Sequence, residues 1–327
     1  MSTAWLVAAR RRLCVPLLAG LLVGCASDPP VHISASTWRQ VDQDIAAASR
    51  SAEDHARQHA LEAMQRWLAL VQRQTDEAFI PWFYGYWTQQ WLSFKVSWYK
   101  LGADEDDPTV RRLAAYLQEE YQELVLEPVA EEVSPERILH ASTRIYVRQL
   151  DMRLQTIPGR HGVPQEQFDQ RLAALPVISG EPGASLYQLI HADPLERLPA
   201  YAGLLERVGA VPGGDWSADP GISLVAQRTS ERLVDEMTTS GAASVVAAMV
   251  GRVAGTALSL GATIFTLIGR DADRPESEAQ LRHSLAVALD QESRALLSSP
   301  DRGVLAGVWY LSGQVEEGLG RPFHYQP

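Results

Sequence analysis

Apolar residues recur every three or four positions through most of the chain, which is the spacing that an amphipathic α-helix produces. From about residue 37 onward this spacing continues through Trp38, Val41, Ile45, Ala48, Ala52, Ala56, Ala63, Trp67, Leu68 and Val71. The pattern predicts one long first helix. Because its early stripe is mostly alanine, we expect another helix to pack closely against it.

Three later stretches have the same periodicity. Their apolar positions are Val110, Leu113, Leu117, Tyr121 and Leu124; then Leu281, Leu285, Leu289 and Leu296; and finally Leu305, Val308, Leu311, Val315 and Leu319. No segment alternates apolar and polar residues between turn-forming residues, as a half-buried strand would. The sequence therefore predicts an all-α protein, a multi-helix bundle with no sheet.

Helix starts are indicated by a capping residue directly followed by proline. The side-chain oxygen of the first residue can accept a hydrogen bond from a free amide of the first turn, and proline at the first helical position gives up no needed donor. We expect a helix to begin at each such pair, namely Asp107-Pro108, Ser134-Pro135, Asp193-Pro194, Asp219-Pro220 and Ser299-Pro300.

Two stretches interrupt the helical pattern most strongly. Residues 175–185 and 209–223 are the richest in proline and glycine, which mark turns and loops. Either could separate two helical regions, and a division at the first would give an N-terminal helical region, 37–175, and a C-terminal helical region, 185–327. A single large bundle is the alternative.

Aromatic residues are concentrated in one segment. Residues 81–99 contain nine aromatic side chains, in a chain that is 8% aromatic overall. On a helix, one stripe would consist of Phe79, Phe83, Trp87, Trp91, Phe94 and Trp98, opposite Gly85, Gln89, Ser93 and Lys100. We expect an amphipathic helix that Pro81 bends or begins, with a capped start at Thr75.

Three interpretations of this aromatic stripe stay open. Large rings could form the core of the bundle. They could instead lie at a lipid interface, which Trp and Tyr favour. As a third interpretation, a surface made of Phe83, Trp87, Trp91, Phe94 and Trp98 could bind a glycan, peptidoglycan or lipid.

A second unusual segment, 241–269, is apolar and rich in small residues. Every fourth position from Ala243 is small, a ladder made of Ala243, Ala247, Gly251, Gly255, Ser259 and Thr263. Ala247, Gly251, Gly255 and Ser259 would let another helix approach closely, as in small-xxx-small motifs. Arg252 is the only charged residue, and an arginine inside a bilayer is costly.

The sequence favours a buried helix over a membrane span for this segment. We expect it to pack against the aromatic helix in a common core, with Arg252 paired to a carboxylate. The rival hypothesis is a hydrophobic hairpin formed by 79–99 and 241–269 that inserts into membranes or forms a pore.

The N-terminus has the order of a secretory signal peptide. Arginines at 10–12 precede an apolar run from Leu13 to Val23, which is too short to span a bilayer permanently. Leu22-Val23-Gly24-Cys25 resembles the lipobox of bacterial lipoproteins. That resemblance implies cleavage after residue 24 and acylation of Cys25, a diacylglycerol thioether together with an N-acyl chain.

The same resemblance implies that the protein is located in the cell envelope. Residues 25–36 contain two prolines and no apolar period, so we interpret them as a tether. In bacterial lipoproteins an Asp after the cysteine favours the inner membrane, and this chain has Ala26. We therefore expect an outer-membrane lipoprotein that faces the periplasm, with the inner membrane as the alternative.

Charge and cysteine usage narrow the functional classes. Loss of residues 1–24 removes three arginines and no acidic residue, so the net charge falls from −11 to −14. Such an acidic body is poorly suited to nucleic acid. Apart from Cys25 the chain has only Cys14, which lies in the signal peptide. No thiol remains for a disulfide or a cysteine nucleophile.

Motifs for catalysis are weak. His55, His59 and Glu62 share one helical face and are the best candidates for a metal site, but the surrounding residues are those of a solvated surface. No cofactor fingerprint is present, and no catalytic residues can be named. We expect a non-catalytic envelope scaffold or binding module, whose partners are the membrane through the anchor and other envelope proteins, lipid or peptidoglycan. The alternatives are a pore-forming protein and an enzyme acting on envelope polymers.

Overall fold

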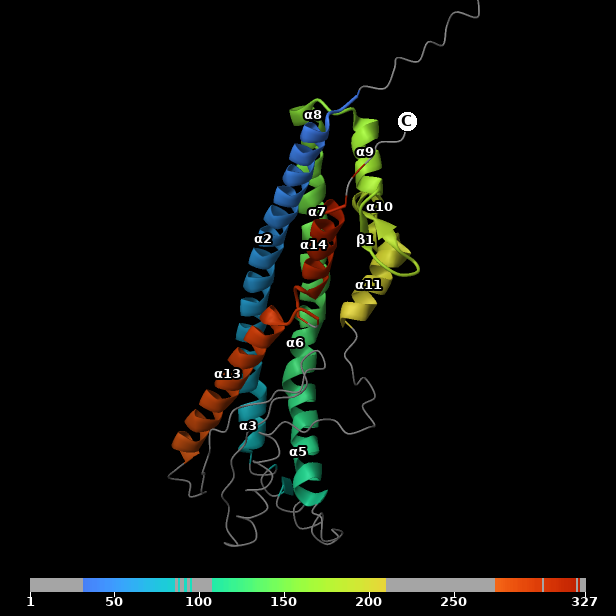
Figure 1. Ribbon diagram of the computed structural model, residues 1–327. Coiled ribbons are helices and arrows are strands. Elements are labelled where there is room, and N and C mark those ends of the chain that lie inside the picture. The colour runs from blue at the N-terminus through green and yellow to red at the C-terminus, as the bar shows by residue number, and fades with distance from the viewer. Residues whose placement is uncertain are drawn as a thin grey trace, which may run out of the picture.

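Two long helical arms lie side by side along the molecule (Figure 1). The computed structural model describes residues 32–85, 88, 91, 92, 95, 108–209, 274–301, 303–321 and 323. The first arm comprises α2 (Ala35–Gln74), the π-helical turn η1 (Thr75–Phe79) and α3 (Ile80–Phe83). The second arm returns along it through α5 (Pro108–Tyr121), the π-helical turn η2 (Gln122–Leu126), α6 (Glu127–Glu132) and α7 (Pro135–Leu154).

The predicted long first helix is confirmed. Helix α2 has 40 residues, so it is about 60 Å long at 1.5 Å per residue. Ser34 caps it, because its hydroxyl oxygen accepts a hydrogen bond from the amide of Thr37 at 3.1 Å. Its alanine stripe is buried, and α7 packs along it. A buried hydrogen bond of 2.8 Å joins Ser49 of α2 to Tyr146 of α7.

The remaining elements are also mostly helical. They are α8 (Ile157–His161), α9 (Gln165–Ala173), α10 (Leu186–His191), the 3₁₀ turn η3 (Leu195–Arg197), α11 (Pro199–Gly209), α13 (Arg274–Ser298) and α14 (Ala306–Leu319). Helix α14 packs against both α2 and α7, and α13 packs against α2 (Figure 1). The leucines predicted for α13 are buried, as are Val308, Leu311 and Val315 of α14. The all-α prediction is confirmed.

One small sheet occurs that the sequence did not indicate. Strands β1 (Pro176–Ile178) and β2 (Ala184–Ser185) pair antiparallel within the stretch predicted as a break. They are too short for an alternating pattern to be visible. The hairpin packs against α14, where the amide of Ser179 donates to the hydroxyl of Tyr310 at 3.2 Å. A helix of the C-terminal region thus contacts both this hairpin and the N-terminal arms.

The capping pairs give a mixed result. Helix α5 begins at Pro108, and Ser134 caps α7 by accepting from the amide of Arg137 at 3.2 Å. The other two pairs in the described part of the chain were wrong as α-helix starts. Asp193-Pro194 precedes the 3₁₀ turn η3, which has no side-chain cap.

Ser299-Pro300 follows the end of α13 instead of starting a helix, and α14 begins later at Ala306. The reason is that the carbonyl of Leu296 accepts from the amide of Val304 at 2.8 Å, and the carbonyl of Ser299 accepts from the amide of Gly303 at 3.0 Å. These two bonds fold the chain back on the end of α13.

Several predictions fall outside the described residues. These are the signal peptide, Cys25, the pair Asp219-Pro220, and the small-residue segment 241–269 with Ala247, Gly251, Arg252, Gly255 and Ser259. Within the described residues, no helix combines the length and the apolar character that crossing a membrane requires.

Candidate functional site

Two π-helical turns face each other at the end of the bundle away from the start of α2 (Figure 1). Each is followed, two residues after its end, by a proline: Pro81 after η1 and Pro128 after η2. Proline lacks an amide proton, and its ring clashes with the carbonyl four residues earlier. The wider π-helical turn, which inserts one residue, lets the helix continue past the proline. Pro81 therefore neither ends nor begins the first arm.

The inserted residues change the hydrophobic periodicity. Along the second arm the buried positions advance by four, through Leu117, Tyr121, Val125 and Val129. Leu124, which the sequence placed in the buried stripe, is only partly buried. The prediction was wrong there because the added residue rotates the buried face by one position.

A side chain compensates for the amide that Pro128 lacks. The carbonyl of Leu124 lies four residues before this proline, so it lacks the amide from which it would accept in an α-helix. The side-chain amide of Gln74 on the facing arm donates to that oxygen at 3.0 Å. This bond joins the two arms at the level of the π-helical turns.

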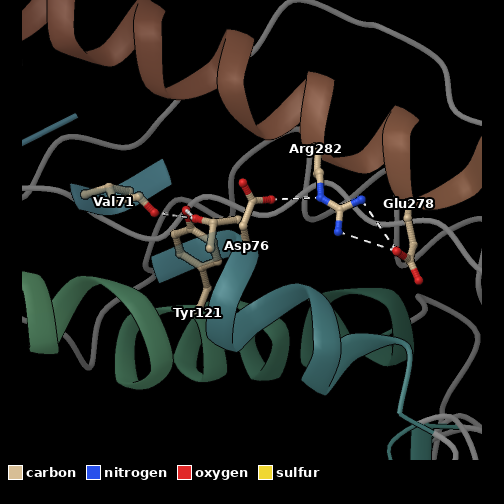
Figure 2. Close-up of polar contacts among 6 residues, drawn as sticks. Val71, Asp76, Tyr121, Glu278 and Arg282 are labelled. Atoms are coloured by element: carbon tan, nitrogen blue, oxygen red, sulfur yellow. Dashed lines mark hydrogen bonds and ion pairs between the residues drawn. The ribbon is translucent and has the colours of Figure 1, made fainter. Parts of the chain in front are cut away.

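The next residue of the first arm, Thr75, forms a buried hydroxyl pair with Tyr121 (Figure 2). The Thr75 hydroxyl donates to the carbonyl of Val71 at 2.7 Å and lies 2.8 Å from the hydroxyl of Tyr121. Since the Thr75 proton is used on Val71, Tyr121 is the donor of the second bond. Burial raises the pKa of Tyr121 well above its ordinary value, so the hydroxyl stays protonated. The predicted capped start at Thr75 was wrong, because Thr75 lies inside a continuous helix.

An ion-pair network fastens α13 to η1. The Nε of Arg282 lies 2.8 Å from a carboxylate oxygen of Asp76, and the same guanidinium lies 3.4 Å from Glu278 (Figure 2). The side chains of Arg282 and Asp76 are 41% and 53% exposed. Solvent screening therefore limits this pair to about 1 kcal/mol or less. The network links α13 to η1 at this end of the bundle.

Aromatic rings pack around the two π-helical turns. We call Phe79, Trp82, Phe83, Tyr84, Tyr116 and Tyr121 the distal aromatic cluster. The rings of Phe79 and Tyr121 meet edge to face with centroids 5.0 Å apart, and those of Phe83 and Tyr84 do so at 5.2 Å. Phe79, Phe83 and Tyr121 are fully buried. Edge-to-face geometry is favourable for aromatic pairs, so these rings form a rigid base.

A cationic side chain covers the outer side of this base. The ammonium of Lys95 lies 3.2 Å from the ring centroid of Tyr116 and 5.7 Å from that of Trp91. Trp91 is 49% exposed, which is unusual for so large an apolar side chain. We call Trp91, Lys95 and Tyr116 the outer group. It combines an accessible aromatic ring with a positive charge held by cation–π attraction.

The predicted aromatic stripe is only partly visible in the structure. Phe83 is buried in the base, and Trp91 is exposed in the outer group. Trp87, Phe94 and Trp98 lie outside the described residues. The predicted unbroken helix was wrong at 84–85, where α3 ends and the amide of Gly85 bonds to the carbonyl of Trp82.

The core interpretation holds for Phe79 and Phe83, whose rings are buried. Among the described residues, their neighbours across the bundle come from the second arm, such as Tyr121. The expected neighbour, segment 241–269, is not described. Tyr116 could not be predicted as part of this site, because its position opposite Lys95 depends on how the two arms align.

The weak metal candidates lie apart from this site, on α2. The Nδ1 of His55 is 2.7 Å from the carbonyl of Ser51 on its own helix, and Glu62 accepts from the side chain of Gln58 at 2.8 Å. Over the residues described, no three histidine, cysteine or acidic side chains gather in an arrangement that could hold a metal ion.

Comparison of the chain with protein-family models, with curated proteins and with solved structures found no match. The chemistry of the outer group therefore has to be interpreted from its geometry. An exposed indole can stack on the flat apolar face of a sugar or another ring, and an ammonium can pair with a carboxylate.

Proposed function

We propose that this protein is a lipid-anchored component of the bacterial cell envelope that binds a partner through its outer group and does not catalyse a reaction. The signal peptide and the lipobox ending at Cys25 support the anchor. The exposed ring of Trp91 beside Lys95 supports the binding role.

The observation that carries this proposal is the distance between the anchored end of the chain and the outer group. The chain enters α2 at one end of the bundle, and α3 and α5, which carry most of the distal aromatic cluster, lie at the other (Figure 1). Helix α2 alone spans about 60 Å between them. A body tethered through Cys25 can therefore present the outer group far from its anchoring point, as a scaffold in the periplasm would.

Peptidoglycan is the first partner to test. It offers sugar rings that stack on an indole and peptide carboxylates that pair with an ammonium. The full chain, purified in mild detergent, is sedimented with isolated peptidoglycan, and envelope proteins are captured in parallel by crosslinking in cells. We expect Trp91→Ala and Lys95→Gln to reduce one of these two interactions by about tenfold, since loss of a stacked ring or a paired charge costs 1 kcal/mol or more.

The matched control is Val287→Ala, which removes apolar atoms from an exposed side chain of α13 outside the cluster. It should leave both interactions unchanged. If Trp91→Ala and Lys95→Gln bind peptidoglycan and crosslinked partners as the unmodified protein does, the outer group has no binding role. Release of a dye from vesicles by the purified chain would instead favour the pore-forming alternative.

A further inference from the structure

A pocket lies at the opposite end of the bundle from the outer group. Its volume is about 350 Å³, and it lies between α2, the C-terminal turn of α7 and the following helix α8. It is lined by Asp44, Ala47, Ala48, Met152, Arg153, Thr156 and Arg160. The space exists because Ala47 and Ala48 place only methyl groups opposite the end of α7. The pocket is therefore a consequence of the alanine stripe that the sequence shows in α2.

The carboxylate in the lining of this pocket is paired, whereas one of the two arginines is not paired within the described part of the chain. One carboxylate oxygen of Asp44 accepts from Arg160 at 2.9 Å and lies 2.9 Å from the Nε2 of His161. The single acidic group of the lining is thus already paired. Arg153 has no ion-pair partner among the described residues, and its Nε is buried without a hydrogen bond. This Nε is closed to solvent, so the terminal nitrogens of the guanidinium are the donors that a ligand in the pocket could reach, and no carboxylate of the described residues pairs with them.

The charges that line this pocket are together opposite in sign to the net charge of the protein. The chain carries a net charge of −11, yet this pocket has two arginines and one carboxylate in its lining. A guanidinium presents parallel donors that match the oxygens of a phosphate group. The apolar side chain of Met152, which is 47% exposed, forms part of the same lining.

The pocket also lies near the start of the first arm, because α8, which contributes Arg160, lies beside the start of α2 (Figure 1). Asp44 is nine residues along α2 from Ala35, or about 14 Å along the helix. Ten residues separate Ala35 from Cys25, and an extended chain of that length spans at most about 35 Å. An acylated Cys25 would therefore hold the pocket within reach of the phosphate layer of the membrane.

We propose that this pocket binds the phosphate group of an anionic ligand, with Arg153 as the principal donor and Arg160 as the second. Asp44 limits the affinity, because it competes with the anion for Arg160. The phosphate can come from a phospholipid headgroup or from a soluble phosphate ester, and the two sources share this chemistry. The site is independent of the binding role proposed for the outer group.

The test uses the full chain carrying Cys25→Ser, so that no acyl chain contributes to binding. Inorganic phosphate and glycerol phosphate are titrated calorimetrically. Co-sedimentation is measured with vesicles of phosphatidylglycerol and phosphatidylcholine, and with phosphatidylcholine alone. We expect Arg153→Gln to weaken binding by about tenfold or more, as loss of a charged hydrogen bond does. Arg160→Gln should have a smaller effect, because that side chain is shared with Asp44.

Two further variants separate a ligand site from general charge and from misfolding. Arg148→Gln removes the same charge from an exposed position of α7 outside the pocket lining and should leave binding unchanged. Asp44→Asn should tighten binding several-fold, because it frees Arg160 and removes a negative charge. A purely structural role of these residues would not produce a gain.

The binding measurements identify the source of the phosphate and show whether the pocket binds it. Binding of the soluble phosphates identifies a soluble source, and binding only to vesicles with phosphatidylglycerol identifies a headgroup. Either supports the proposal if Arg153→Gln weakens it selectively. The proposal is overturned if none of these probes binds, or if Arg148→Gln reduces binding as much as Arg153→Gln does. Peptidoglycan sedimentation is unaffected by either result, so the two proposals fail separately.

Discussion

Gly307 of α14 lies against Thr143 of α7 with no space for a side chain between them. A β-carbon placed at Gly307 would come within 2.5 Å of the Thr143 hydroxyl oxygen and 3.0 Å of its methyl group. Thr143 is fully buried, and its hydroxyl donates to the carbonyl of Leu139 at 2.8 Å. This branched side chain has little freedom to move away. The close contact of α14 with α7 therefore depends on glycine.

We expect Gly307→Ala to lower the free energy of unfolding by about 1 to 2 kcal/mol, since overpacking costs more than the gain in helix propensity. Urea denaturation monitored by circular dichroism measures this. Gly313→Ala, on the same helix with nothing within 4 Å of the added carbon, should stabilise slightly. Combining Gly307→Ala with Thr143→Ala should recover part of the loss. If Gly307→Ala is as stable as the unmodified protein, the packing argument is wrong.

The sequence predicted those features of the fold that depend on local periodicity. The 40-residue helix α2, the buried leucines of α13 and the cap at Ser134 each follow from neighbours in the chain. Their patterns can be interpreted without knowing what packs against them. The close approach at Gly307 could not be predicted, because it depends on which residue of α7 lies opposite.

The candidate site was predictable in part for the same reason. The concentration of rings in 81–99 indicated a special segment, and a proline within a helical stripe was a visible sign of irregularity. No local pattern indicated that the helix would continue through a π-helical turn at Pro81 and again at Pro128. The contact of Lys95 with Tyr116 and the pocket at Arg153 are long-range, so local patterns could not indicate them.

Arg171 provides a second stability test. It is 2% exposed and pairs with Asp42 at 2.8 Å, whereas Asp42 is 22% exposed. Removing the acid leaves a buried positive charge without its partner, which costs about 3 to 5 kcal/mol. We therefore expect Asp42→Asn to destabilise the protein more than Arg171→Met does. Urea denaturation at neutral pH measures both. Equal losses would show that the burial of Arg171 does not govern the cost.

Three buried tyrosines should make stability depend on alkaline pH. Burial raises the pKa of Tyr121, Tyr146 and Tyr201 above the ordinary value of about 10. The unfolded chain therefore loses these protons first as the pH rises, and the folded state binds more protons than the unfolded state. Their contribution is complete below about pH 10 and is lost progressively above it, by up to about 1.4 kcal/mol per pH unit for each tyrosine.

Tyr121→Phe isolates one of these groups. We expect unfolding free energies measured in urea from pH 8 to 11 to fall less steeply above pH 10 in this variant. At pH 8 the variant should already be less stable by about 0.5 to 1.5 kcal/mol, because the hydrogen bond to Thr75 is lost. An unchanged slope above pH 10 would mean that Tyr121 ionises in the folded state as easily as in the unfolded chain.

Substituting each of the two cysteines of the chain in turn tests the lipid anchor proposed at Cys25. If Cys25 is acylated, its several chains hold the protein at the membrane, because each buried methylene contributes about 0.8 kcal/mol and one chain alone is marginal. We expect Cys25→Ser to move the protein from the membrane fraction to the soluble fraction and to abolish incorporation of labelled palmitate. Cys14→Ser, inside the signal peptide, should change neither. A Cys25→Ser variant that still sediments with membranes would show that the protein body binds them without the anchor.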